Sequence, residues 1–448
     1  MSDPSSLVTQ GAQLSLRRTL KSAAVVNTDV TVYDSQEFIG GQHFWVTFDT
    51  GSSDLWVVSV DCEDADCQGI TRYSRAVSQT LNLSDKPFEL TYLRGSVQGN
   101  VGTETITLGA YQISSQTFAL ANHTNGLDLT NAGNSGILGL SFLAAAAIQP
   151  TWGTTLLDNL FGHFDQSNRF FAFKLGRNGT KEDARTYSSF TIGRLDSAVT
   201  NDTSQMTFFP VFGTKDSPYD YWKLTIQKIM INGLAVPLSR SLVLGAESPI
   251  GVLDTGTTLM LGPTADVEAF WTMIGVGGSA RYNEQLQSWE VLCNRVVDVR
   301  IEVGDAGNTK EYALHPEDIS WAERRERDGW CLGGVQANDR VDSGDWLLGD
   351  VFLRNVYVVH QGATSSRPPV IGLMSMTDPN SSISEFTNVR GPDFAPAPSA
   401  PSRSYSNQSD ADVEAASAVC AIAGFLLGGL GTVFYWVKKG SRRATARL

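Results

Sequence analysis

Short apolar runs separated by polar turn residues are the main pattern along this chain. Strand-favouring residues recur in FWVTFDTG at 44–51, LWVVSV at 55–60 and VYVVH at 356–360, with Gly, Asn, Asp and Ser between such runs. Short strands spaced by turn signals predict a mostly β architecture. Sustained helical periodicity is scarce before the C-terminal segment. We therefore expect the folded part to extend from about Val25 to Met374.

The C-terminal part predicts a membrane anchor. Residues 375–414 are rich in Pro, Ser, Asp and Ala without apolar periodicity, which predicts a disordered stalk. Residues 415–437 contain no charged residue, and 23 residues in a helix span about 34 Å, enough to cross a bilayer. The basic tail, 438–448, is expected on the cytoplasmic side. The folded part should then be extracellular or lumenal, in the secretory pathway.

The apolar segment has two other possible interpretations, a cleaved lipid-anchor signal and a buried core helix. A cleaved lipid-anchor signal would suit the small residues Ala415, Ala416 and Ser417, but such signals normally end with the apolar run, and this one continues into basic residues. A buried core helix is disfavoured because nothing follows that could cover it. Residues 1–24 lack the apolar stretch of a signal peptide, so we expect the true start to lie upstream of Met1. They would be a leader or the remnant of a prosegment.

Charge and composition narrow the possible partners. The net charge of −13 and the pI near 4.9 argue against a nucleic-acid partner, because phosphates would not be neutralised. N-glycosylation sequons, each weak alone, support an exported protein. These sequons begin at Asn82, Asn122, Asn178, Asn201, Asn380 and Asn407.

The five cysteines fit an oxidising compartment. Cys62 and Cys67 bracket four residues, a spacing suited to a small disulfide loop, and Cys293 and Cys331 lie in the same half of the chain. Cys420 lies in the apolar segment. The alternative that all five are reduced and buried stays open. No histidine lies at ligand spacing from either pair, so we expect no metal site.

An internal repeat gives the strongest functional signal. Phe48–Ser52 (FDTGS) recurs as Leu253–Thr257 (LDTGT), and about ninety residues after each comes a second matching signal, Gly136–Leu140 (GILGL) and Trp346–Asp350 (WLLGD). Two halves that carry the same signals in the same order predict two pseudo-symmetric lobes with a cleft between them. We expect these lobes at 25–205 and 206–374.

The repeated motif predicts a pair of carboxyls. An apolar strand that runs into Asp-Thr-Gly places a carboxylate at a tight, partly buried turn, where glycine allows close approach. Two such turns across a two-fold axis would bring Asp49 and Asp254 into one site. Adjacent carboxylates cannot both ionise, so the pair would share a proton and supply both a general base and a general acid. The residues expected to support the pair are Ser52, Thr257, Gly51 and Gly256.

These motifs resemble the pepsin family of aspartic proteases over roughly Val25 to Leu373. The family pattern FDTGSSxLWV is present at Phe48–Val57, and the second-lobe pattern is present at Val252–Thr258. Tyr221–Leu224 resembles the strand that enters the second lobe, and Trp346–Arg354 resembles the closing WILGDxFLR.

The resemblance implies a bilobal pepsin-like fold and an aspartic endopeptidase that acts on peptides or proteins without a cofactor. It implies that Tyr92 lies in a flap hairpin over the substrate and that Trp56 hydrogen-bonds that tyrosine. The usual disulfides of the family coincide with Cys62–Cys67 and Cys293–Cys331. We expect a monomeric folded part.

Departures from the family pattern concern specificity. Leu93 replaces the glycine that usually follows the flap tyrosine, and Arg94 beside it would favour acidic substrate side chains or point to solvent. The alternatives to an enzyme are an inactive binding protein and a surface adhesion protein. An inactive binding protein on the same fold would generally lose an aspartate or the hydroxyl behind it, yet this chain keeps all four. A surface adhesion protein would leave the repeated motif unexplained.

Overall fold

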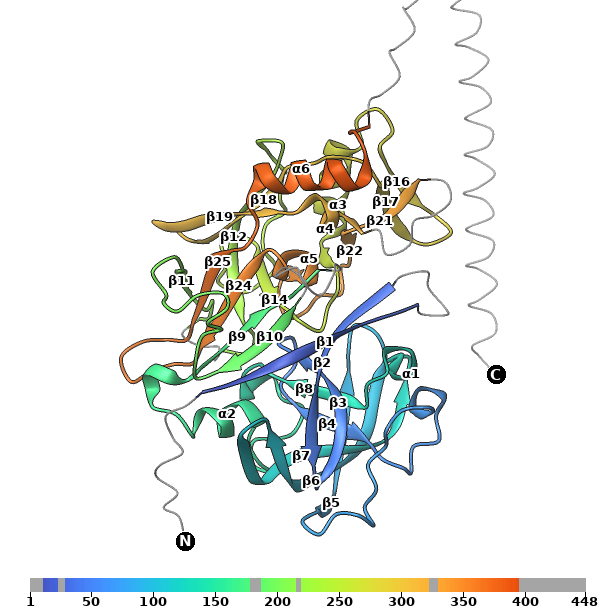
Figure 1. The fold of residues 1–448 in the computed structure, drawn as a ribbon, viewed down its shortest axis with the longest axis vertical. Coiled ribbons are helices and arrows are strands. Elements are labelled where there is room, and N and C mark those ends of the chain that lie inside the picture. The colour runs from blue at the N-terminus through green and yellow to red at the C-terminus, as the bar shows by residue number, and fades with distance from the viewer. Residues whose placement is uncertain (1–10, 23–28, 178–186, 215–218, 322–328, 395–448) are drawn as a thin grey trace, which may run out of the picture. The chain divides into compact units, whose positions relative to one another are not determined.

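The computed structural model describes residues 11–22, 29–177, 187–214, 219–321 and 329–394, which belong to one compact unit. This part is mostly β, with a lower and an upper lobe joined by a sheet in Figure 1. The predicted mostly β, two-lobed fold is therefore confirmed.

The largest sheet has thirteen strands among the described residues, in the order β11-β25-β24-β9-β10-β1-β2-β3-β8-β4-β7-β6-β5. Its middle strands connect the two lobes. The bounds of its strands are β1 (Ala12–Ser22), β2 (Asp29–Ile39), β3 (Gln42–Asp49), β4 (Leu55–Val58), β5 (Asn82–Thr91), β6 (Ser96–Leu108), β7 (Tyr111–Asn125), β8 (Gly136–Gly139), β9 (Phe170–Lys174), β10 (Ser188–Ile192), β11 (Thr207–Pro210), β24 (Val356–Gln361) and β25 (Val370–Ser375).

Two further sheets build the second lobe. One has the order β19-β18-β12-β14-β23-β15-β22 with β13 on β12, and the other has the order β16-β17-β21-β20. Their strands are β12 (Lys223–Ile231), β13 (Leu234–Ala235), β14 (Ile250–Leu253), β15 (Met260–Gly262), β16 (Ala280–Asn283), β17 (Ser288–Leu292), β18 (Val299–Asp305), β19 (Asn308–Leu314), β20 (Ser320–Trp321), β21 (Trp330–Gly333), β22 (Val335–Ala337) and β23 (Trp346–Leu348).

Helices are short and lie around the sheets (Figure 1). The α-helices are α1 (Leu129–Ala132), α2 (Leu156–Phe161), α3 (Thr264–Ile274), α4 (Pro316–Ile319), α5 (Asp350–Leu353) and α6 (Pro379–Arg390). Single 3-10 turns occupy Ala65–Cys67, Leu143–Ala145 and Gln166–Asn168.

The internal repeat of the sequence is also a repeat of strand pairing. In the first lobe β3 runs parallel to β8, β8 antiparallel to β4, and β4 parallel to β7. In the second lobe β14 runs parallel to β23, β23 antiparallel to β15, and β15 parallel to β22. Each Asp-Thr-Gly motif thus leaves its sheet at an equivalent place, beside the strand that carries the second signal of the repeat.

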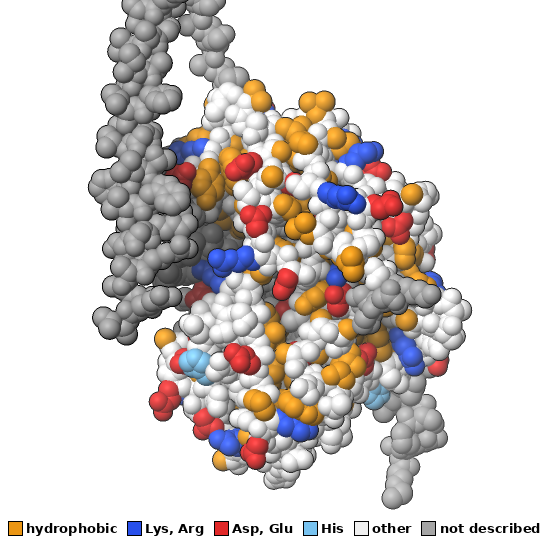
Figure 2. Space-filling model, turned by 180° about the vertical axis from the view of Figure 1, so that it is seen from behind, with side chains coloured by type: hydrophobic (Ala, Val, Ile, Leu, Met, Phe, Trp, Pro, Cys, Tyr) orange, Lys and Arg blue, Asp and Glu red, His pale blue; other side chains and the backbone are white. Residues whose placement is uncertain are grey.

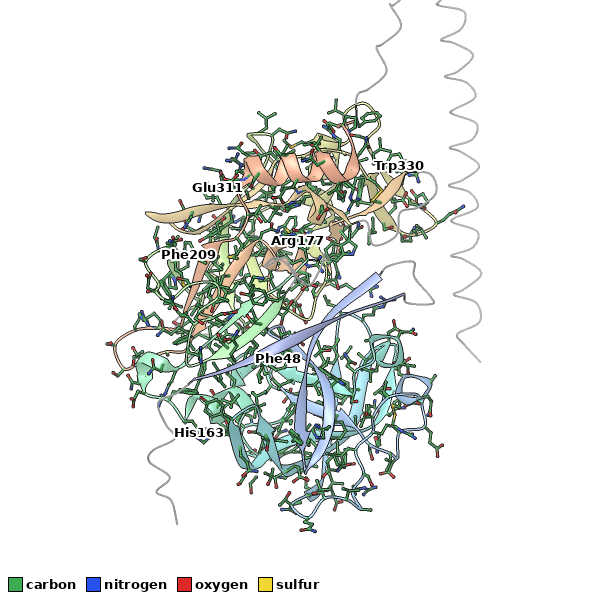
Figure 3. All side chains as sticks on the ribbon, viewed as in Figure 1. Phe48, His163, Arg177, Phe209, Glu311 and Trp330 are labelled. Carbon is green, nitrogen blue, oxygen red and sulfur yellow. A yellow bond between two sulfur atoms is a disulfide. The ribbon has the colours of Figure 1, made fainter. Side chains whose placement is uncertain are left out.

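Aromatic packing unites the core beneath the two motifs. Phe48, labelled in Figure 3, is fully buried and lies 4.8 Å from Phe190 between ring centres. Trp222 is also fully buried, and its Nε1 donates to the carbonyl of Leu140 at 2.8 Å. Such large buried rings contribute much of the apolar burial that stabilises a domain. They fix the strands that lead into both motifs.

A buried polar contact ties the shared sheet to the second lobe. Arg177, labelled in Figure 3, follows β9 and donates to the buried carboxylate of Asp318 and, at 2.6 Å, to Asn355 Oδ1. Burial opposes ionisation of Asp318, but the charges of Arg177 and Arg354 act the other way, and its pKa lies below the usual value. Asp318 is therefore an ionised carboxylate held by fixed partners.

The leader or prosegment remnant predicted at 1–24 stays a prediction, but its second half forms a strand of the fold. Residues Ala12–Leu16 pair with β10, and 17–22 pair with β2, so β1 belongs to the sheet that joins the lobes. Ala12, Leu14 and Leu16 alternate with polar residues, which is the period of a strand with one buried face. This alternation covers only five residues, and the basic residues Arg17 and Arg18 that follow interrupt it, so the sequence did not predict the strand.

The predicted start of the disordered stalk, residue 375, is too early, because a helix of the fold follows it. Residues 379–390 form α6, which starts at the capping side chain of Asp378, the acceptor for the backbone N–H of Ser381 at 2.9 Å. Phe386 is fully buried, and the helix packs against α4. A single turn with Ile383 and Phe386 on one face was enough to dock a segment whose overall composition is polar.

The predicted transmembrane segment, 415–437, lies outside the described residues. Among the residues that are described, no helix has the length and apolar character to cross a membrane. The lobe boundary predicted at 205 and 206 stays a prediction, since β9, β10, β24 and β25 form one sheet between the lobes.

The buried imidazole of His360 predicts how stability depends on pH. It stacks on Phe171 at 4.5 Å and meets Trp222 edge-on at 4.9 Å, and neither ring nitrogen has a hydrogen-bond partner among the described residues. Burial lowers the pKa of His360 to about 3, from an ordinary value of 6.5. The unfolded chain therefore takes up a proton as pH falls below 6.5, while the folded chain does not.

We expect this group to remove up to about 1.4 kcal/mol of folding free energy per pH unit between these two pKa values. His360→Phe should flatten the fall in unfolding free energy between about pH 6.5 and pH 4.5, measured by chemical denaturation. The control is His43→Phe, at an exposed histidine, which should keep the wild-type slope. An unchanged slope in His360→Phe would refute this account.

Candidate active site

Two threonines lock the motif loops together. The backbone N–H of Thr50 donates to Thr255 Oγ1 at 3.0 Å, and the N–H of Thr255 donates to Thr50 Oγ1 at 3.0 Å. Each hydroxyl in turn donates across the junction at 2.8 Å, from Thr50 to the carbonyl of Leu253 and from Thr255 to that of Phe48. Both threonines are buried. Four hydrogen bonds thus fix one loop against the other.

Each aspartate is held by its own loop. The N–H of Gly51 donates to Asp49 Oδ1 at 2.8 Å, and the Ser52 hydroxyl donates to Asp49 Oδ2 at 2.5 Å. The second loop repeats this pattern for Asp254, with Gly256 at 2.8 Å and Thr257 at 2.6 Å. The carboxyls are therefore oriented before any substrate arrives.

The structure brings the two predicted carboxyls together. A Cβ atom added at Gly51 would lie 2.5 Å from Asp254 Oδ1, and one added at Gly256 would lie 2.5 Å from Asp49 Oδ1. Each glycine therefore makes room for the carboxyl of the opposite lobe. Asp49 is 5% exposed and Asp254 is 7% exposed, so both are nearly buried.

The environment favours a proton on this pair. Burial raises the pKa of Asp49, the negative charge of Asp254 raises it further, and the bonds from Ser52 and Gly51 lower it by less. A proton is consequently retained at pH values where an isolated aspartate would have lost it. Because the carboxyls are coupled, the titration belongs to the pair.

The predicted flap is a hairpin formed by β5 and β6. At its tip the N–H of Tyr92 donates to the carbonyl of Gly95 at 3.0 Å, and Gly95 has a φ of +83°, which suits glycine. Trp56 Nε1 donates to the Tyr92 hydroxyl at 2.7 Å. Burial raises the pKa of Tyr92 well above its usual value, and the charge of Asp49 adds to the rise. Tyr92 thus lies within electrostatic reach of Asp49, while Leu93 next to it is exposed.

The cysteines form the two disulfides that the resemblance implies, Cys62–Cys67 and Cys293–Cys331. Cys62 and Cys67 also lie near Asp64, but their sulfurs are bonded to each other and are not available as thiolate ligands for a metal. Cys420 lies outside the described residues.

Sequence reasoning missed three residues of this site. It assigned no role to Thr50 and Thr255, although the repeat itself was the available signal, since both copies carry threonine at that place. It treated Asp54 as freely variable, yet Asp54 is buried and accepts from the N–H groups of Ala147 and Ile148 at 2.7 and 3.1 Å. Burial raises the pKa of Asp54 despite these bonds.

Comparison with known proteins gives matches over most of the chain. Residues 39–367 match the family described as Eukaryotic aspartyl protease. The chain is 30% identical to chymosin of Callithrix jacchus over 324 residues, which cover 72% of this chain and 76% of that protein. It is 29% identical to pepsin A of Canis lupus familiaris over 326 residues, with 72% and 76% covered. Chymosin of Bos taurus is 28% identical over 348 residues, with 76% and 82% covered.

The glycine contacts predict a loss of activity when either glycine gains a methyl group. Gly51→Ala or Gly256→Ala should displace the opposite carboxyl and lower kcat by about 10²-fold or more, as small displacements of reacting groups do. Peptide hydrolysis by the purified variants measures this. Gly162→Ala is the control, because Gly162 follows α2 with a φ of −61° that alanine also adopts, and it should keep full activity. Full activity in the two motif variants would contradict the geometry.

Proposed function

Because the chain belongs to the eukaryotic aspartyl protease family and is an aspartic endopeptidase, we propose that Asp49 and Asp254 carry out its hydrolysis as a pair that shares one proton. The observation that supports this most directly is the contact of each motif glycine with the opposite carboxyl. Two carboxyls so close, nearly buried and individually oriented, are suited to move protons in both directions.

The proposed reaction needs one water and one peptide bond. The ionised carboxyl removes a proton from the water, whose oxygen attacks the peptide carbonyl carbon. The protonated carboxyl donates its proton to the carbonyl oxygen, which gives a tetrahedral diol. The C–N bond then breaks as a proton passes to the amine nitrogen and a diol hydroxyl returns its proton to the pair. The products are a carboxylic acid and an amine, and no cofactor takes part.

The neighbouring hydroxyls have a positioning role in this proposal. Ser52 and Thr257 each donate to the Oδ2 atom of their aspartate, which prevents rotation of the carboxyl. An oriented pair needs no rearrangement when charge develops on the tetrahedral intermediate. Tyr92, tied to Trp56, would lie over the bound substrate as the flap residue.

Substitution of either aspartate tests the proposal. Asp49→Asn and Asp254→Asn each remove one carboxyl that can exchange protons, so we expect peptide hydrolysis in mild acid to fall by roughly 10³-fold or more. Circular dichroism should show both variants folded. Asp305→Asn, an exposed residue of the β18–β19 hairpin, is the matched control and should keep wild-type activity.

Retention of activity by either variant would refute the two-carboxyl mechanism. A wild-type chain that binds peptides but cleaves none of them would favour the alternative, an inactive binding protein on the same fold.

We also propose that the protease part is extracellular or lumenal and that residues 415–437 anchor it in a membrane. Two disulfides suit an oxidising compartment. The four described sequon asparagines are all exposed, as glycan attachment requires: Asn82, Asn122, Asn201 and Asn380. Alkaline extraction of membranes that carry the full chain, beside a chain ending at Glu414, tests the anchor.

A further inference from the structure

A cavity of 440 Å³ lies in the second lobe, beside the strand that leads from the first lobe. The carbonyl of Asp220, one of its lining residues, accepts hydrogen bonds from the Ser141 hydroxyl at 2.8 Å and the Phe142 N–H at 3.2 Å. Ser141 and Phe142 follow β8 closely, and β8 ends at Gly139 beside Asp49. The cavity is therefore close to the motif loop of the first lobe.

Tyr221 connects this cavity to the two motif aspartates. Burial raises the pKa of Tyr221 to about 12, and four carboxylates add to the rise, in the order Asp342, Asp220, Asp49 and Asp254. All four negative charges can raise the pKa of one phenol only if that phenol lies near the carboxylates of the cavity and near the two motif aspartates. Asp342 and Asp220 line the cavity, so the charges of the cavity and of the aspartate pair both act on Tyr221.

The cavity has an apolar wall beside its polar and charged lining residues. Phe212 and Val341 line it, as does the segment Leu242–Leu244. Leu242 is 94% exposed and Leu244 is 89% exposed, although leucine is usually buried. Such walls can bury the methylene groups of a long side chain.

The charges at the cavity leave one carboxylate uncompensated. Lys223 Nζ contacts Asp220 Oδ2 at 2.8 Å and lies 5.6 Å from the ring centre of Tyr221, so the positive charge of Lys223 is already compensated. Asp342 is exposed and has neither a hydrogen bond nor an ion pair with any residue that the structure describes. Among the residues that the structure describes, none competes with an incoming cation for Asp342.

We propose that this cavity is a substrate subsite for a lysine or arginine side chain, with Asp342 as the residue that selects the positive charge. The stem of the side chain would pack on Phe212 and Val341 while its charged end reaches Asp342, as long basic side chains do at apolar surfaces with a polar edge. The endopeptidase would therefore favour peptides with a basic residue on one side of the scissile bond. This inference rests on the proposed function, because only a bound polypeptide would place such a residue there.

The experiment compares paired peptides with the full chain. The peptides come from a random pool and then differ only by lysine or norleucine at the position where the pool shows a basic preference. The wild-type chain should cleave the lysine peptide with the higher kcat/KM. In Asp342→Asn the lysine-to-norleucine ratio should fall about two- to fivefold, the range of an exposed ion pair.

A control separates the local charge from the charge of the whole protein. Acidic and basic side chains are interspersed on the face shown in Figure 2, so removal of any one carboxylate also changes the overall field. Glu284→Gln removes an exposed carboxylate at the turn after β16 and should leave the ratio unchanged. A wild-type pool without basic preference, or an unchanged ratio in Asp342→Asn, would overturn the inference.

A peptide-binding measurement distinguishes failure of the subsite from failure of the proposed catalytic function. Fluorescence anisotropy of the same peptide pair is measured with the Asp49→Asn chain, with and without Asp342→Asn. Preferential binding of the lysine peptide that Asp342→Asn weakens supports the subsite even if no variant hydrolyses peptides. Equal binding of the two peptides by both chains contradicts the subsite even if the wild-type chain is an active peptidase.

Discussion

The reciprocal hydrogen bonds between Thr50 and Thr255 are the constraint on which the site depends. Each lobe has its own strands and presents its aspartate at the end of a buried strand. Nothing within one lobe fixes the distance to the other aspartate. The threonines do so, because each uses both its backbone N–H and its hydroxyl across the junction, in a buried place where an unmade hydrogen bond costs about 1–3 kcal/mol. The lobes therefore cannot shift at this point without loss of several such bonds.

Close approach of two carboxyls opposes folding when both are ionised, and the surrounding atoms reduce that cost. Glycine N–H groups and hydroxyls donate to each carboxyl, and a shared proton removes most of the repulsion between them. In the proposed mechanism the same arrangement lets one carboxyl accept a proton while the other donates one. The stability of the pair and its proposed chemistry would then have a common origin in the two Asp-Thr-Gly turns.

The sequence predicted the aspartate pair because the internal repeat of the two lobes is visible in short motifs. Two copies of one motif, each followed by the same second signal, correspond to equivalent strand pairings in the two lobes. Local patterns failed where tertiary contacts decide the outcome. The strand β1 needs partners from distant segments, α6 docks through Phe386 in a polar stretch, and Asp54 accepts hydrogen bonds from a loop more than ninety residues away. The place of Asp342 at the cavity is equally invisible in sequence, since its environment comes from four separated segments.

A double-mutant cycle on the two threonines tests the central claim most directly. Thr50→Val and Thr255→Val each remove a hydroxyl from the exchange of hydrogen bonds between the two threonines. The measurement is kcat/KM for a peptide substrate with both single variants and the double variant, and circular dichroism checks that each is folded. If the exchange is one unit that positions the pair, the double variant will lose little more activity than either single variant. Fully additive losses, or single variants with wild-type activity, would contradict the account.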